Sequence, residues 1–236
     1  PDPTPEFPMT CHVPAVLAAP PVALPPPFNV ADKIVAVAEA LQPVLAAGQP
    51  IDTGMLRAEM ERAFGGSDAT GAWDWKLAYE AGEAALVLFL RKFGRALLAR
   101  AGSPGALLPI LAKVAGLLPT HTRRSEEMER FQQFSTPLPM GLAALAAGQI
   151  TPRDLVIEPS AGTGLLAILA EIAGGSLALN ELADTRADLL RLLFPGCPVT
   201  RFDAAQIDDH LDAGMRPSVI LMNPPFSAMA NVEVGD

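Results

Sequence analysis

The chain has 236 residues, of which 50% are hydrophobic, and a formal net charge of −9 at pH 7. This acidic balance excludes a broad, nonspecific attraction to phosphate groups, although it leaves room for a local cationic site. The strongest apolar run, residues 84–90, is far too short to span a bilayer. The two cysteines, Cys11 and Cys197, have neither metal-site spacing nor a disulfide framework, which favours a reducing, cytoplasmic setting.

The first half of the chain reads as a proline-rich leader, residues 1–30, followed by an α-helical domain, residues 31–118. Ala and Leu recur there with helical periodicity, and glycines and prolines interrupt the pattern. The third helix carries aromatic residues at core spacing, and its cations, Lys76, Arg91, Lys92 and Arg95, are predicted to form a solvated face. The pattern predicts helices over residues 31–47, 53–64, 73–100 and 104–117.

Residues 119–236 alternate strands and helices, which predicts an α/β fold with a Rossmann-like parallel sheet of about four strands. An apolar run at 154–157 is followed by a glycine-rich turn and a helix that starts at Leu165. The further strands are expected at 176–180, 198–202 and 219–222, and the second strand is followed by a helix over 183–194.

The turn after the first of these strands has the layout of a nucleotide-binding βα unit. Gly162 and Gly164 allow positive φ angles and a close approach of backbone to a ligand, and the following helix offers free N–H groups. Glu181 ends the second strand about 20 residues after the turn, where a ribose diol is normally held. Its alternative role is to complement the dipole of the next helix. Asp203 ends the third strand, and either accepts an adenine amino group or caps the segment 205–212.

The fourth strand ends in Asn223-Pro224-Pro225-Phe226. The two prolines make this backbone stiff and extended. A planar amino group at the sheet rim could donate to the Asn223 side-chain oxygen and the Pro224 carbonyl while its ring stacks on Phe226. Such acceptors keep the nitrogen lone pair available for attack, so the run predicts alkylation of an amino nitrogen. The alternative is a strand followed by a Pro-Pro turn.

Together these segments resemble the class I S-adenosylmethionine-dependent methyltransferases that methylate amino groups. The segment 158–164 looks like their first motif and Glu181 like their ribose acid, while Asp203 with Ala204 resembles their adenine contact. Asn223, Pro224, Pro225 and Phe226 look like their catalytic motif. The resemblance implies S-adenosyl-L-methionine as cofactor and no metal, with cofactor contacts in the first motif at Glu158, Pro159, Ala161, Gly162 and Gly164.

One further element, Phe134-Ser135-Thr136-Pro137, precedes the glycine turn as a Phe-x-Thr-Pro element does in adenine-N6 DNA methyltransferases of the gamma arrangement. In that family the element covers the methionine end of the cofactor, which implies contacts from Phe134, Thr136 and Pro137. From the residues alone, Thr136 is a good helix cap and Pro137 a good first helical residue.

A closer resemblance is to the methyltransferase-like segment of large bacterial strawberry-notch-like proteins, in which a helicase-type ATPase follows. The resemblance implies two partners: DNA, or RNA, and a C-terminal helicase-like region of the same parent protein. It implies no membrane. Helicase motifs are absent from the 236 residues of this sequence. A complete fold of this class needs about three more strands, so the methyltransferase domain, residues 119–236, is expected to be truncated with an exposed apolar edge at its fourth strand. The residues that carry this resemblance are 71–76, 122–127, 132–137 and 221–227.

The resemblance implies methyl transfer to the exocyclic amino group of an adenine that has flipped out of DNA. A protein-glutamine or RNA amino-methyltransferase is the first alternative, because a glutamine amide is also planar. The second alternative is a catalytically inactive methyltransferase fold that serves as a docking module for a helicase.

Overall fold

The computed structural model describes residues 29–119 and 136–224 of the chain. The predictions made for the leader, for Phe134, and for Pro225 and Phe226 lie outside these residues.

The first described range is helical, as predicted. The helices begin at polar caps: the side chains of Asp52, Asp74 and Ser103 accept hydrogen bonds from backbone N–H groups three residues later, at 2.7, 2.8 and 3.2 Å. Because Asp74 is the cap, the third helix begins at residue 75 and not at 73. The elements are α1 (Val30–Ala46), α2 (Thr53–Phe64), the short 3₁₀ helix η1 (Asp68–Thr70), α3 (Trp75–Ala101) and α4 (Pro104–Ala115).

The second range forms a four-stranded sheet in which every described pairing is parallel, with strand order β3-β2-β1-β4. This confirms the predicted α/β class and Rossmann-like parallel sheet. The third and fourth strands are shorter than predicted, at two residues each. The elements are α6 (Leu138–Gly148), β1 (Leu155–Glu158), α7 (Leu165–Ala173), β2 (Ser176–Asn180), α8 (Asp184–Leu193), β3 (Val199–Thr200), the 3₁₀ segment η2 (Ala204–His210) and β4 (Val219–Ile220).

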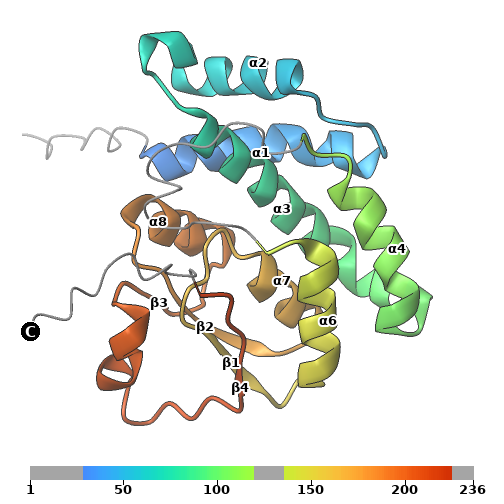
Figure 1. Ribbon diagram of the computed structural model, residues 1–236, viewed down its shortest axis with the longest axis vertical. Coiled ribbons are helices and arrows are strands. Elements are labelled where there is room, and N and C mark those ends of the chain that lie inside the picture. The colour runs from blue at the N-terminus through green and yellow to red at the C-terminus, as the bar shows by residue number, and fades with distance from the viewer. Residues whose placement is uncertain (1–28, 120–135, 225–236) are drawn as a thin grey trace, which may run out of the picture.

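The helices of the first range pack directly on the helices that follow the glycine turn. Figure 1 shows α1 and α3 above α7 and α8, which separate them from the sheet. Gly94 of α3 allows this close approach, because a Cβ atom there would lie 2.9 Å from the Ile172 side chain of α7. The buried side chains of both ranges form one continuous hydrophobic core. The division into separate helical and methyltransferase domains stays a prediction, but the two parts share their interior.

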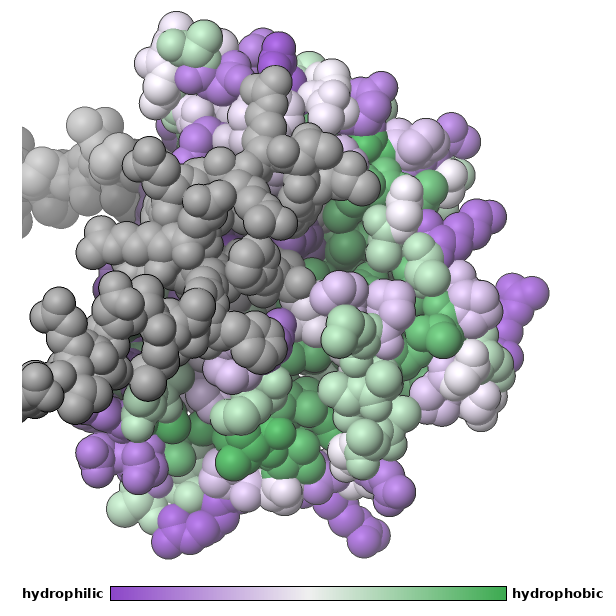
Figure 2. All heavy atoms as spheres, viewed as in Figure 1, coloured by the Kyte–Doolittle hydropathy of each residue, from purple (hydrophilic) through white to green (hydrophobic). Residues whose placement is uncertain are grey.

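Among the described strands, β4 pairs only with β1 and forms an edge of the sheet. Ile220 and Met222 are 61% and 57% exposed. Figure 2 shows a hydrophobic area low on the molecule, in the region where Figure 1 places β4. Within the described residues, the predicted apolar edge at the fourth strand is therefore confirmed.

Asn180, the last residue of β2, joins three neighbouring segments of the sheet rim. Its side chain is 1% exposed and all of its hydrogen-bonding capacity is used. The amide nitrogen donates to the carbonyl oxygens of Pro159 and Phe202, both at 2.9 Å. The amide oxygen accepts from the Thr200 hydroxyl at 2.8 Å and from the Phe202 N–H at 2.9 Å. Asn180 thus ties the start of the glycine turn to the end of β3.

We expect Asn180→Ala to lower the free energy of unfolding by about 2–4 kcal/mol, because four polar groups on two neighbouring segments, all buried or half-buried, lose their partners at once. Urea denaturation followed by circular dichroism measures this change. Asn29→Ala is the matched control, since the exposed Asn29 side chain donates one hydrogen bond to Asp188 at 2.8 Å. Because Asn29 is also the N-cap of α1, this change should cost about 1 kcal/mol, and equal losses in the two variants would contradict the assignment.

Candidate functional site

The glycine turn between β1 and α7 lies at the carboxyl rim of the sheet. The Ala161 N–H donates to the Asn180 carbonyl at 2.9 Å, and the Gly164 N–H donates to the Ala161 carbonyl at 2.8 Å. Gly162 and Gly164 have φ angles of 58° and 88°, a conformation that favours glycine. No heavy atom of the described residues lies within 4 Å of the place where a Gly162 Cβ would stand, so these residues leave the backbone there open to a ligand.

Glu181 reaches this turn from the end of β2. Its carboxylate accepts hydrogen bonds from the Gly162 N–H at 2.8 Å and from the Ala183 N–H at 2.9 Å, and the residue is 8% exposed. The second bond is to the residue that precedes α8, and the helix-dipole role of Glu181 stays a prediction. A ribose role remains a prediction, and it requires that hydroxyl groups share or replace these backbone donors.

Glu158 ends β1 directly beneath the turn. It is 3% exposed, and its Oε2 atom has no hydrogen-bond partner among the described residues. Burial raises the pKa of this carboxyl well above its ordinary value of 4.5, and the nearby Glu181 charge raises it further. An orphaned buried oxygen is costly unless a ligand satisfies it, so Glu158 marks a place for a hydrogen-bond donor.

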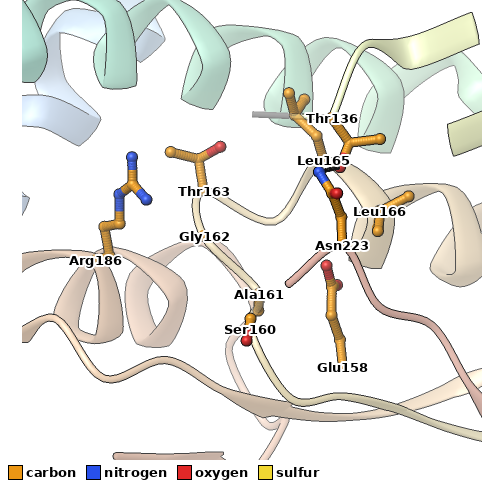
Figure 3. A pocket seen from close by; sticks show the side chains of 10 residues that line it. All are labelled: Thr136, Glu158, Ser160, Ala161, Gly162, Thr163, Leu165, Leu166, Arg186 and Asn223. Atoms are coloured by element: carbon orange, nitrogen blue, oxygen red, sulfur yellow. Dashed lines mark hydrogen bonds between the residues drawn. The ribbon is translucent and has the colours of Figure 1, made fainter. Parts of the chain in front are cut away.

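Asn223, which follows β4, points into the same space. Its Nδ2 atom donates to the Thr136 hydroxyl at 2.9 Å, a contact between residues 87 positions apart (Figure 3). Thr136 is therefore not a helix cap, and that interpretation is wrong: α6 begins at Leu138, and Pro137 occupies the cap position. The hydroxyl of Thr136 turns toward Asn223 and leaves the helix start to the proline.

These segments enclose one pocket with about 310 Å³ of space between atoms, part of it open to solvent. Figure 3 shows the Glu158 side chain pointing toward Asn223 at one end of the pocket and the Asn223 amide pointing on toward Thr136, with Arg186 at the other end. Five predicted site residues line it, together with residues that were not predicted. The lining residues are Thr136, Glu158, Ser160, Ala161, Gly162, Thr163, Leu165, Leu166, Arg186 and Asn223.

Asp203 and Ala204 lie outside this lining, at the start of η2. The Asp203 carboxylate accepts a hydrogen bond from the Ala205 N–H at 3.0 Å, which confirms its capping role. Its adenine contact stays a prediction. Beside it, the rings of Phe202 and His210 stack with centroids 3.9 Å apart.

Sequence reasoning missed a buried charged cluster between α3 and the pocket. Lys76, Glu80 and Glu83 of α3 are 8%, 2% and 4% exposed, and Arg186 of α8 is 6% exposed. The prediction that Lys76 belongs to a solvated face is therefore wrong. A signal was present in the sequence, because these charges recur at helical spacing within an Ala-rich, apolar stretch, where the inward face is the one that packs.

Comparison with protein-family models, with curated proteins and with solved structures gives no match to this chain. Within residues 29–119 and 136–224, no helix is long and apolar enough to cross a membrane. The same ranges hold no group of three or more His, Cys, Asp or Glu side chains placed to bind a metal ion.

Proposed function

We propose that this chain is a class I S-adenosylmethionine-dependent methyltransferase that acts on an exocyclic amino group, with adenine in DNA as the favoured substrate. The observation that carries the proposal is the meeting of two distant segments in one pocket. The turn at 158–164 and Asn223 come from the ends of neighbouring strands β1 and β4. Ligands of open α/β sheets bind outside the carboxyl ends of the strands, which is where both segments lie.

The residues present suit such a cofactor at two points. Glu158 Oε2, buried and without a partner among the described residues, can accept a hydrogen bond from an amino-acid ammonium. The open face of Gly162, next to the start of α7, admits a ligand close to backbone N–H groups. When bound, S-adenosylmethionine supplies a methyl group on a sulfonium that leaves readily.

Asn223 is the residue that would orient the acceptor. Because its Nδ2 atom donates to Thr136, its Oδ1 atom is available to accept a hydrogen from an amino group in the pocket. The Pro224 carbonyl can accept the second hydrogen. Both contacts leave the nitrogen lone pair free, and positioning supplies most of the acceleration. Stacking of a base on Phe226 is the part of the proposal that lies outside the described residues.

The choice of substrate rests on the resemblance to DNA adenine methyltransferases. Transfer of tritiated methyl groups to duplex DNA, single-stranded RNA and a glutamine-containing peptide tests it directly. Label in DNA N6-methyladenine is the expected result. Label in RNA or peptide alone would replace DNA by that substrate, and cofactor binding without transfer to any of the three would favour the docking module.

The raised pKa of Glu158 leads to a prediction about proton release on ligand binding. Its raised pKa keeps the carboxyl protonated above 4.5, whereas pairing with a ligand ammonium favours the ionised form. Binding of S-adenosylhomocysteine, which carries that ammonium, should therefore release up to about one proton per site in the pH window above 4.5 and below the raised pKa. Calorimetry in two buffers of different ionisation enthalpy at one pH measures the release.

Glu158→Gln is the control, because it has no titrating proton and should show a binding enthalpy that does not depend on the buffer. Equal buffer dependence in the wild type and in this variant would contradict the assignment.

The raised pKa of Glu158 also has a consequence for the stability of the protein without ligand. A carboxyl whose folded pKa is raised stabilises the fold fully below its unfolded pKa, and this contribution falls as pH rises above about 4.5.

A further inference from the structure

Helix α3 presents two buried carboxylates to the candidate site. Glu80 and Glu83 lie one helical turn apart and face the glycine turn and α8. The Thr163 hydroxyl donates to Glu83 Oε2 at 2.7 Å, across 80 positions of sequence. The Arg186 Nε atom donates to Glu80 Oε1 at 2.6 Å, across 106 positions. Both donors, Thr163 and Arg186, line the pocket, and Figure 3 shows their side chains pointing toward α3.

These buried charged contacts carry a desolvation cost that offsets much of their attraction, so they are a weakly stabilising way to join α3 to the glycine turn and α8. Burial raises the pKa of Glu80 even though Arg186 and Lys76 oppose the shift, and Glu80 Oε2 has no hydrogen-bond partner among the described residues. Well-packed apolar side chains at such positions are often equally or more stabilising. Elsewhere α3 already meets α7 through apolar packing, as at Gly94 and Ile172. The charged contacts are thus not needed merely to hold the helix in place.

Their position suggests another role. Thr163 stands between Gly162 and Gly164, the two positive-φ residues of the turn, where the backbone is freest to rotate. The bond to Glu83 is a restraint on this segment that comes from outside the sheet. Arg186, on the first turns of α8, is held by Glu80 in the same way.

We infer that α3 is part of the cofactor-binding apparatus, with Glu83 positioning the glycine turn through Thr163 and Glu80 positioning Arg186 at the pocket wall. This rests on the proposed function, because the ligand used to test it is the methyltransferase product. Glu80 and Glu83 are positioning residues, since they touch the lining residues and do not line the pocket themselves.

A double-mutant cycle on the full chain tests the inference, with S-adenosylhomocysteine as the probe and calorimetry for its Kd. Thr163→Val removes the hydroxyl, Glu83→Leu removes the acceptor and leaves an apolar side chain, and Thr163→Ser restores the hydroxyl. We expect each of the first two changes to weaken binding by about tenfold, as for a lost hydrogen bond to a charged group. The double variant should be weakened by little more than either single one, because both remove one contact. Thr163→Ser should bind as the wild type does.

Amide hydrogen exchange at residues 162–164 is the second measurement, since it reports on the turn without a ligand. Exchange there should rise in Glu83→Leu and stay unchanged in Glu61→Leu, a matched change at an exposed position of α2. Wild-type affinity and wild-type exchange in a folded Glu83→Leu variant would overturn the inference and leave the proposed function intact. Failure of the wild-type chain to bind the probe would overturn the proposed function and this inference with it.

Discussion

Under the proposed function, replacing Asn223 by alanine is expected to lower the rate of methyl transfer by about 100-fold or more while leaving cofactor affinity unchanged. The side chain faces the pocket from the end of β4, and Thr136 holds its amide nitrogen at 2.9 Å. Alanine removes the acceptor that would hold the amino group in line. Single-turnover transfer of a tritiated methyl group measures the rate, and calorimetry with S-adenosylhomocysteine measures the affinity.

Two further variants sharpen this result. Met222→Ala changes the exposed neighbouring side chain and should transfer at the wild-type rate. Thr136→Val keeps Asn223 but removes the hydroxyl that orients its amide, so a smaller loss, about tenfold in rate, is expected. Retention of full transfer by Asn223→Ala would refute the catalytic assignment of this residue.

The second large effect is expected at Gly164. A Cβ atom on Gly164 would lie 2.4 Å from Cε2 and 2.8 Å from Cζ of Phe194, and the residue has a φ angle of 88°. Backbone strain of about 1–2 kcal/mol and overpacking of about 1–3 kcal/mol should therefore lower the free energy of unfolding of Gly164→Ala by roughly 3 kcal/mol. Urea denaturation measures the loss, and a concomitant Phe194→Leu change should recover part of it.

Gly162→Ala is the matched comparison at the other end of the turn. Its φ angle is also positive, at 58°, but a Cβ atom there would meet no heavy atom of residues 29–119 and 136–224 within 4 Å. The expected cost is thus backbone strain alone, about 1 kcal/mol. Under the proposed function, however, the new methyl group occupies the ligand's approach, so cofactor binding should be lost. Equal stability of the two alanine variants would show that Phe194 does not pack as described.

Local sequence patterns predicted the secondary structure well. The bounds of α2, residues 53–64, were predicted as they are observed, and the bounds of α1, α3 and α4 were predicted to within two residues. This agreement follows because apolar periodicity and polar caps act within one or two helical turns. The four strands and the turn at Gly162 and Gly164 were also predicted from short runs. The parallel arrangement followed from their alternation with helices, since parallel neighbours need such crossovers.

The predictions that were wrong concern two residues whose side chains could have met either solvent or local backbone, or a distant segment of the chain. Thr136 has the chemistry of a helix cap, but its hydroxyl meets Asn223 from a strand 87 positions away. Lys76 was expected in solvent, yet it is 8% exposed, on a helix whose Glu80 pairs with Arg186 of α8. The partner of Thr136 cannot be read from its neighbours in the chain, because it depends on which distant segment arrives at that surface, whereas the burial of Lys76 was indicated by the helical spacing of the α3 charges.

The amino-acid sequence by itself determined that this protein is an α/β chain with a glycine turn and an Asn-Pro-Pro run at strand ends, since these are properties of short segments. Only the tertiary structure decided that Glu158, Thr136 and Asn223 share one pocket, and that Glu80 and Glu83 of α3 contact two residues of its lining. The physical reason is that hydrogen bonds and burial depend on distances in space, which packing sets between segments far apart along the chain.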